Sequence, residues 1–188
     1  MDTTPVQPSF LEFWNTHFGV RNPVGHHLRK SLHPRWVRFH SIQGSKRYAE
    51  TEEEWVELFK RHNRIADEVL GKGARCWLVS AHSHEDGDLR DRFDFNYQFS
   101  WFENDGFDED IEWPVYAAET IWQAGQFDSA IQKIASDEDR FLLFVSQVTY
   151  AIFSPYDGGM DVICPSGKQT SILKAKFPSW LPNNEYGL

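Results

Sequence analysis

The sequence predicts an α+β fold, with a mainly antiparallel sheet of about six strands packed against one long helix and two or three shorter helices. An apolar period of 3.6 residues runs through residues 51–70, and a period of two recurs in short runs from residue 76 onward. Turn residues rather than helical crossovers join most of these runs, which favours antiparallel pairing. At 188 residues the chain fits one domain, with residues 35–188 as its core.

The first 34 residues predict a short helix followed by a loop, outside that core. Ser9 stands in a capping position, Gly19 follows the last helical residue, and four aromatic residues between them share one face. Residues 20–34 hold two prolines, a glycine and a cluster of basic and histidine residues, which predicts an exposed loop. Residues 35–40 then alternate as a half-buried strand does.

The long helix has clear ends. Thr51 caps it, Glu52 to Glu54 fill its first turn, where they complement the helix dipole, and Gly71 follows it. Its predicted core stripe comprises Trp55, Leu58, Phe59, His62, Ile65, Ala66 and Val69.

The remaining elements alternate between strands and short helices. Strands are expected at residues 76–81, 93–102, 115–122, 141–145, 150–153 and 160–163, and helices at 127–135 and 168–177. The Asp157-Gly158-Gly159 turn predicts a tight hairpin whose glycines adopt positive φ.

The net charge of −9 is unevenly distributed. Residues 1–75 carry +3, residues 76–162 carry −14 and residues 163–188 carry +2. An acidic surface repels phosphate backbones and attracts basic proteins, so no nucleic acid is expected as a partner.

Cysteine usage and hydropathy predict a cytoplasmic protein with no membrane segment. Cys76 and Cys164 each sit in an apolar stretch, as buried thiols do, and they do not form a disulfide framework. The N-terminus lacks a basic and then apolar signal segment, and no apolar run reaches ~18 residues.

No cofactor and no metal are expected. His82 and His84, with Asp86 or Asp88, alternate as metal ligands on a strand would, but no further histidine follows them, which favours a polar strand end. The acidic run 103–112 lacks the oxygen ligands of a calcium loop in the required register.

One basic segment precedes the long helix, whose first N–H groups attract anions. Its candidate anion-binding residues are Arg38, His40, Ser45, Lys46, Arg47 and Tyr48. The alternative is that Lys46 and Arg47 form ordinary ion pairs with nearby acids such as Glu50 to Glu54. Asp157 and Asp161 are a further candidate carboxylate pair.

Two motifs carry a family resemblance: R-x-H-S-x-x-x-S-K-R-Y-A from Arg38 to Ala49, and P-Y-D-G-G-M-D-V-I from Pro155 to Ile163. They resemble an uncharacterised family of small bacterial proteins, a domain of unknown function, over the stretch from about residue 35 to the C-terminus. The resemblance implies a bacterial cytosolic protein and nothing about activity. Catalysis is less expected than binding because the sequence has no Gly-x-Ser-x-Gly elbow or comparable nucleophile frame.

The leading hypothesis is therefore a non-catalytic protein-binding module whose acidic face engages a basic partner, by analogy with immunity proteins. The candidate binding residues are Trp101, Asp105, Phe107, Asp108, Glu109, Asp110, Glu112 and Trp113, with the aromatic residues among them expected to be exposed. The alternative is an enzyme or ligand-binding protein that holds an anionic small molecule with the Arg38 to Tyr48 segment. Convergence of that segment with Asp157 or Asp161 in a pocket would favour the alternative, and pairing with Glu50 to Glu54 would disfavour it.

Overall fold

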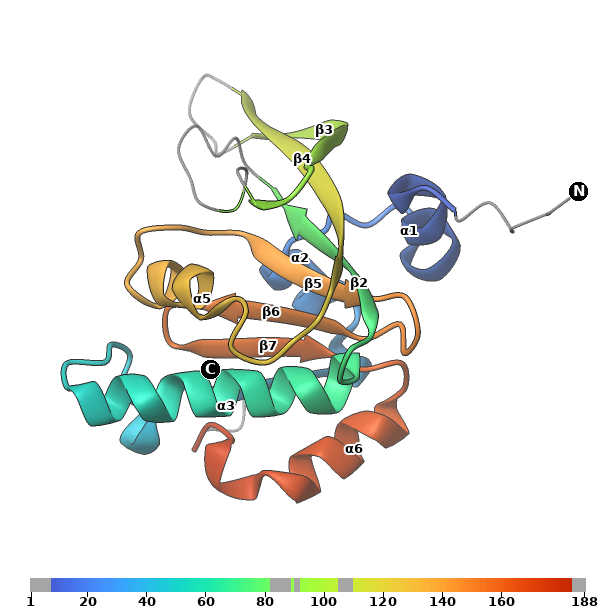
Figure 1. The fold of residues 1–188 in the computed structure, drawn as a ribbon. Helices are drawn as coiled ribbons and strands as arrows, with labels where there is room; N and C mark the ends of the chain where they lie inside the picture. Colours follow the sequence, from blue (N-terminus) through green and yellow to red (C-terminus); the bar gives the residue numbers. More distant parts are fainter. Residues whose placement is uncertain (1–7, 82–88, 90–91, 105–109, 184–188) are drawn as a thin grey trace, which may run out of the picture.

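The computed structural model describes residues 8–81, 89, 92–104 and 110–183. Five helices of at least two turns lie within these residues: α1 (Phe10–Phe18), α2 (Gly25–Ser31), α3 (Glu52–Leu70), α5 (Asp128–Ala135) and α6 (Gly167–Lys176). Seven strands lie in the same described part: β1 (Trp36–His40), β2 (Arg75–Ser80), β3 (Asn96–Asn104), β4 (Asp110–Ile121), β5 (Leu142–Ser146), β6 (Ile152–Tyr156) and β7 (Gly159–Ile163). The fold is α+β, as the sequence predicts (Figure 1).

The seven strands form one sheet in the order β1-β7-β6-β5-β2-β4-β3, and every neighbouring pair is antiparallel. The expected number of about six is therefore too low. The additional strand is β1, which the sequence predicts as a strand but does not place in the sheet. It pairs with β7, so Trp36 lies opposite Ile163.

Each face of the sheet carries a buried core. On one face, side chains such as Leu78, Phe144 and Val162 form a core with α3, α5 and α6. On the other face, Trp77 and Val145 pack against the aromatic residues of α1 and against α2. Successive strand residues point to opposite faces, so a single strand contributes to both cores.

The cores therefore include the N-terminal residues that the sequence analysis places outside them. Phe10, Trp14 and Phe18 of α1 are each at most 2% exposed. Ser9 and Thr51 each form a capping box with the glutamate three residues later, which satisfies N–H groups at the starts of α1 and α3.

Residues 25–31 form the helix α2, and the prediction of a loop there is wrong. The N-cap residue Val24 makes no side-chain capping bond, so the usual sequence signal for a helix start is missing. Leu28 is fully buried, and this tertiary contact stabilises a helix that local sequence alone does not specify.

Gly159 has a different role from the one predicted. Neither Gly158 nor Gly159 is among the residues with positive φ. Instead, a Cβ atom on Gly159 would lie 2.1 Å from the Phe39 carbonyl oxygen. The glycine therefore allows β1 to approach the start of β7.

The two cysteines are buried and unpaired, as the sequence predicts. Burial raises the pKa of Cys76 to about 12, so its thiol stays protonated at neutral pH. No helix in the described ranges combines the length and apolar character needed to cross a membrane.

Candidate functional site

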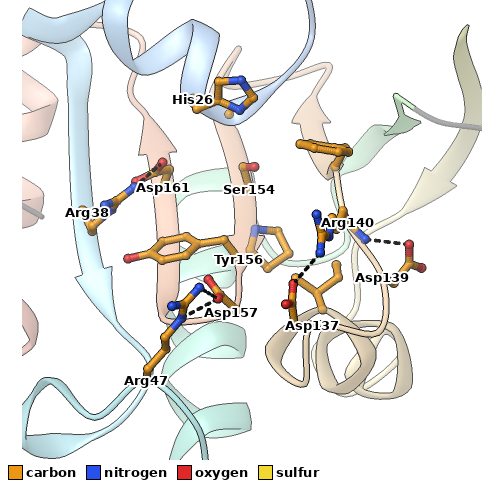
Figure 2. Close-up of a pocket in the computed structure, with 14 residues that line it drawn as sticks. His26, Arg38, Arg47, Asp137, Asp139, Arg140, Ser154, Tyr156, Asp157 and Asp161 are labelled. Atoms are coloured by element: carbon orange, nitrogen blue, oxygen red, sulfur yellow. Dashed lines mark hydrogen bonds and ion pairs between the residues drawn. The ribbon is translucent and has the colours of Figure 1, made fainter. Parts of the chain in front are cut away.

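A pocket of about 390 Å³ opens beside the β6–β7 turn. Its walls come from the start of α2, from β1 and the segment after it, from β6 and β7, and from residues 134–141, which comprise the end of α5 and its connection to β5 (Figure 2). Three arginines, four aspartates and one histidine line it: Arg38, Arg47, Arg140, Asp137, Asp139, Asp157, Asp161 and His26.

An ion pair between Arg38 and Asp161 borders the pocket. The two residues lie opposite each other in the β1–β7 register. Arg38 donates from Nε to Oδ1 at 2.8 Å and from Nη2 to Oδ2 at 3.0 Å, and the Trp36 indole N–H donates to the same Oδ1 at 3.0 Å. Burial would lower the pKa of Arg38, but the hydrogen bond and charge of Asp161 outweigh it and raise that pKa.

The Tyr156 ring lies beside this pair. The Arg38 guanidinium carbon is 4.4 Å from the ring centroid, within the range of a cation–π contact. Burial raises the pKa of the Tyr156 hydroxyl, so this group stays protonated at neutral pH.

A second ion pair stands at the pocket mouth. Arg47 donates to Asp157, at the turn between β6 and β7, and the Tyr48 hydroxyl is 3.5 Å from the same carboxylate oxygen. The Arg47 guanidinium carbon lies 5.3 Å from the Tyr48 ring centroid. Because the Arg47 side chain is 64% exposed, a molecule entering the pocket can reach its guanidinium group.

The opposite wall carries a third arginine (Figure 2). Arg140 Nη2 lies 3.4 Å from Asp137 Oδ1, and the Arg140 backbone N–H donates to Asp139 at 2.7 Å. Asp137 and Phe141 both have φ of 59°, a conformation that costs energy in residues with a side chain. Two such residues in one short connection indicate a backbone shape that the surrounding structure holds in place.

The start of α2 borders the pocket next to Ser154 of β6. A Cβ atom on Gly25 would lie 2.7 Å from Ser154 Oγ, so glycine lets the helix sit directly over β6. Next to it, burial lowers the pKa of His26, and the neighbouring His27 lowers it further. His26 is therefore predominantly neutral at pH 7.

Only some residues of the predicted anion-binding segment line the pocket. Arg38 and Arg47 line the pocket together with Asp157 and Asp161. Lys46 instead forms ion pairs with Glu50 and Glu54, at 2.8 and 2.9 Å, as in the alternative considered for it.

The other members of that segment lie outside the pocket lining. His40 forms a hydrogen bond with the Gly158 backbone, and burial lowers its pKa. Ser45 ends a short 3-10 turn, Gln43–Ser45, and Tyr48 reaches the site only through Asp157.

The predicted acidic face is only partly described. Asp105, Phe107, Asp108 and Glu109 lie outside the described residues, Asp110 begins β4, and Glu112 is exposed.

The expectation that Trp101 and Trp113 are exposed is wrong. Both rings are partly buried, and they lie 5.9 Å apart with an interplanar angle of 10°. Trp113 also packs edge-on against Phe141 at 4.8 Å. Phe102, by contrast, is 65% exposed.

The α5–β5 wall and the part of α2 that borders the pocket are not recognisable from the sequence. Asp137, Asp139 and Arg140 fall in an ordinary polar connection, and His26 falls in the segment predicted as an exposed loop. The run Ser136-Asp137-Glu138-Asp139-Arg140 before an apolar strand is the one local signal for that wall.

The metal candidates His82, His84 and Asp86 also lie outside the described residues. Within the described part of the chain, no three His, Cys, Asp or Glu side chains are grouped as metal ligands.

No match is found among the curated proteins or among the solved structures. A family model covers residues 24–185 and so begins within the N-terminal segment, ahead of residue 35, where the resemblance noted from the motifs starts. The chain belongs to the family described as domain of unknown function DUF3885.

Proposed function

We propose that this protein binds a small polar anion in the pocket beside the β6–β7 turn. The observation that carries the proposal is the placement of Arg47 and Arg140 on opposite walls, with Arg38 beside Asp161 on the β1 side of the pocket. Side chains from five separate parts of the chain meet here, which is typical of a binding site. The volume of about 390 Å³ falls within the usual range for small-molecule pockets.

The two outer arginines retain binding capacity. A guanidinium group has five N–H donors, and Asp157 accepts only from the Nε and Nη2 atoms of Arg47. Arg140 is 62% exposed and makes one long contact to Asp137. A carboxylate or phosphate group placed between them would receive charge-assisted hydrogen bonds from both walls.

The aspartates of the pocket indicate which other groups the ligand carries. Four carboxylates line the same pocket, and they would repel a simple anion. Hydroxyl or amino groups on the ligand would satisfy these carboxylates as hydrogen-bond donors. The lining therefore favours a small anion that also carries hydrogen-bond donors.

We favour binding over catalysis. Ser154 Oγ makes its contact with the Leu142 carbonyl oxygen, at 3.5 Å, rather than with a histidine that would activate it. Tyr156, with its raised pKa, is a poor general base at neutral pH.

Calorimetry with a panel of small anions tests the proposal, using inorganic phosphate, citrate, sugar phosphates and acidic amino acids as probes. At least one probe should bind the wild type, and Arg47→Ala and Arg140→Ala should each weaken that binding about tenfold or more. Lys60→Ala is the matched control, because Lys60 is 70% exposed and paired with Glu57 away from the pocket. Binding unaffected by either arginine variant would contradict the proposal.

The acidic face is a second candidate function, supported by exposed apolar side chains on the β3–β4 hairpin. Phe102 is 65% and Ile111 is 43% exposed, and both lie near the acids Glu103 and Glu112. We propose that this hairpin binds a basic partner protein.

Charge reversal tests this second function. Changing Asp108, Glu109 and Asp110 to Lys alters the local charge from −3 to +3. A pull-down should recover a basic protein with the wild type but not with the variant, and recovery should fall as salt screens the charges. Identical recovery by both proteins would argue against the acidic face as a binding surface.

A further inference from the structure

β3 forms one end of the sheet. It pairs with β4, and in the described part of the chain it has no second neighbouring strand. Every residue from Asn96 to Glu103 is at least partly exposed. At the other end of the sheet, Trp36, Val37 and Phe39 of β1 are buried and α6 lies against the strand.

This edge has little protection against pairing with another strand. Natural edge strands commonly carry lysine or proline, and β3 has neither. Its irregularities are one register shift between Tyr97 and Phe99 and one charge, Glu103. A strand of nine residues whose second edge pairs with no described strand offers a row of backbone donors and acceptors.

The charge of the hairpin restricts what can pair there. Residues 96–121 contain seven Asp or Glu and no Lys or Arg. A second copy of the chain would bring two such acidic hairpins together, which is electrostatically unfavourable. A basic segment would gain from the same charges.

The two faces of the hairpin tip carry the same residue types, and on one of them Glu103 Oε1 also lies 3.5 Å from His27 Nε2. In the register of β3 and β4, Phe102 lies opposite Glu112, and Glu103 lies opposite Ile111. Each face therefore carries one acid beside one exposed apolar side chain. An added strand with basic and apolar residues would find complementary neighbours on either face.

We propose that the edge of β3 accepts an extended, basic segment of a partner protein as an additional antiparallel strand. The inference rests on the second proposed function, and it specifies how the acidic hairpin recognises its partner. Main-chain hydrogen bonds would supply affinity, and the acids would select a basic strand.

Three synthetic peptides of about β3 length test the proposal by fluorescence anisotropy. The first alternates lysine and valine. The second is the same peptide with two consecutive central amides N-methylated, which blocks both edges because successive amides point to opposite sides. The third alternates glutamate and valine.

The first peptide should bind, and the N-methylated peptide should bind about tenfold more weakly, because one methylated amide faces β3, where it can no longer donate and its methyl group holds the strands apart. The acidic peptide should not bind. Glu112→Lys should weaken the first peptide more than Glu119→Lys, since Glu119 lies on β4 beyond the stretch that pairs with β3. Amide hydrogen exchange in β3 should slow on binding.

Equal binding of the first two peptides would overturn strand addition and leave the acidic face as a purely electrostatic binding surface. Failure of the lysine–valine peptide to bind at all would overturn both. These two results therefore separate the inference from the proposal on which it rests.

Discussion

Asp161 shows how one residue determines the shape of the candidate pocket. It is 5% exposed and accepts hydrogen bonds from Arg38 and from the Trp36 indole. Its carboxylate neutralises a guanidinium that is itself largely withdrawn from water, with 11% of the Arg38 side chain exposed. The pair fixes one wall of the pocket, and Arg47 and Arg140 then border its opening.

Replacing Asp161 with alanine should reduce stability by about 3–5 kcal/mol, because the Arg38 charge would be left buried without a partner. Urea unfolding measures this loss. Asp157→Ala is the control, since its partner Arg47 is exposed to water, and its effect should be much smaller. Comparable losses of unfolding free energy in the two variants would show that the Arg38–Asp161 pair stabilises the fold no more than the Arg47–Asp157 pair does.

His62 should make stability depend on pH. It is fully buried between the carbonyl oxygens of Leu58 and Gly159, and burial lowers its pKa from 6.5 to about 4. Between these values the unfolded chain binds more protons than the folded chain, so stability should fall as pH is lowered through this window, by about 3 kcal/mol in all.

The His62→Gln variant cannot titrate at this position, so its stability should fall less than that of the wild type between pH 6.5 and pH 4. Denaturant unfolding at several pH values gives the difference, and the exposed His33→Gln serves as control. Parallel pH profiles for wild type and His62→Gln would contradict the prediction.

At the same scale, the sequence predicts part of the site. Four of its residues are recognisable as candidate binding residues: Arg38, Arg47, Asp157 and Asp161. The two arginines stand in a basic segment just before a long helix, and the two aspartates flank a glycine turn. Their pairing depends on the β1–β7 register, which joins segments far apart in the chain. Arg140 lies in no recognisable sequence motif. Its loop is unusual only in the structure, where Asp137 and Phe141 have positive φ.

Among the elements, α3 follows most directly from its sequence. Its capping box and apolar period act locally, so Thr51 and the stripe to Val69 predict its start and its buried face. The predicted stripe overestimates burial at the N-terminal end of the helix. Trp55 and Phe59 are only partly buried there, and their ring centroids lie 5.7 Å apart. α2 was missed because tertiary packing rather than a local cap stabilises it.

Burial along α3 predicts a graded set of effects. Leu58→Ala should reduce the free energy of unfolding by about 2–5 kcal/mol, because Leu58 is fully buried. Trp55→Ala should cost less than Leu58→Ala, since part of the Trp55 ring remains in water. Val56→Ala, at a position 62% exposed, should change stability by about 0.5 kcal/mol or less. A larger loss of unfolding free energy for Trp55→Ala than for Leu58→Ala would contradict the order of burial along α3.

On the scale of the whole molecule, the extent of the core differs from the extent of the family match. The match begins at residue 24, yet α1 lies before it and covers one face of the sheet. The aromatic face of α1 predicts that this helix is packed, but only long-range contacts decide that it packs on this sheet.

A truncated chain that begins at Val24 should therefore fold poorly. Losing Phe10, Trp14 and Phe18 removes three buried aromatic side chains, each worth about 3–5 kcal/mol when truncated to alanine, against a typical total stability of about 5–15 kcal/mol. Circular dichroism and thermal melting of the purified fragment provide the measurement. A cooperative melt close to that of the full chain would show that α1 is dispensable.

The pairing of β1 with β7 also has a consequence for synthesis of the chain. Trp36 leaves the ribosome long before its partner Ile163, and at about 5–20 residues per second the interval is on the order of ten seconds. During that time the backbone donors and acceptors of β1 lack the strand that will pair with them. Arg38 and Asp161 meet only when this pairing forms, so a nascent chain acquires the pocket only after residues 159–163 have been made.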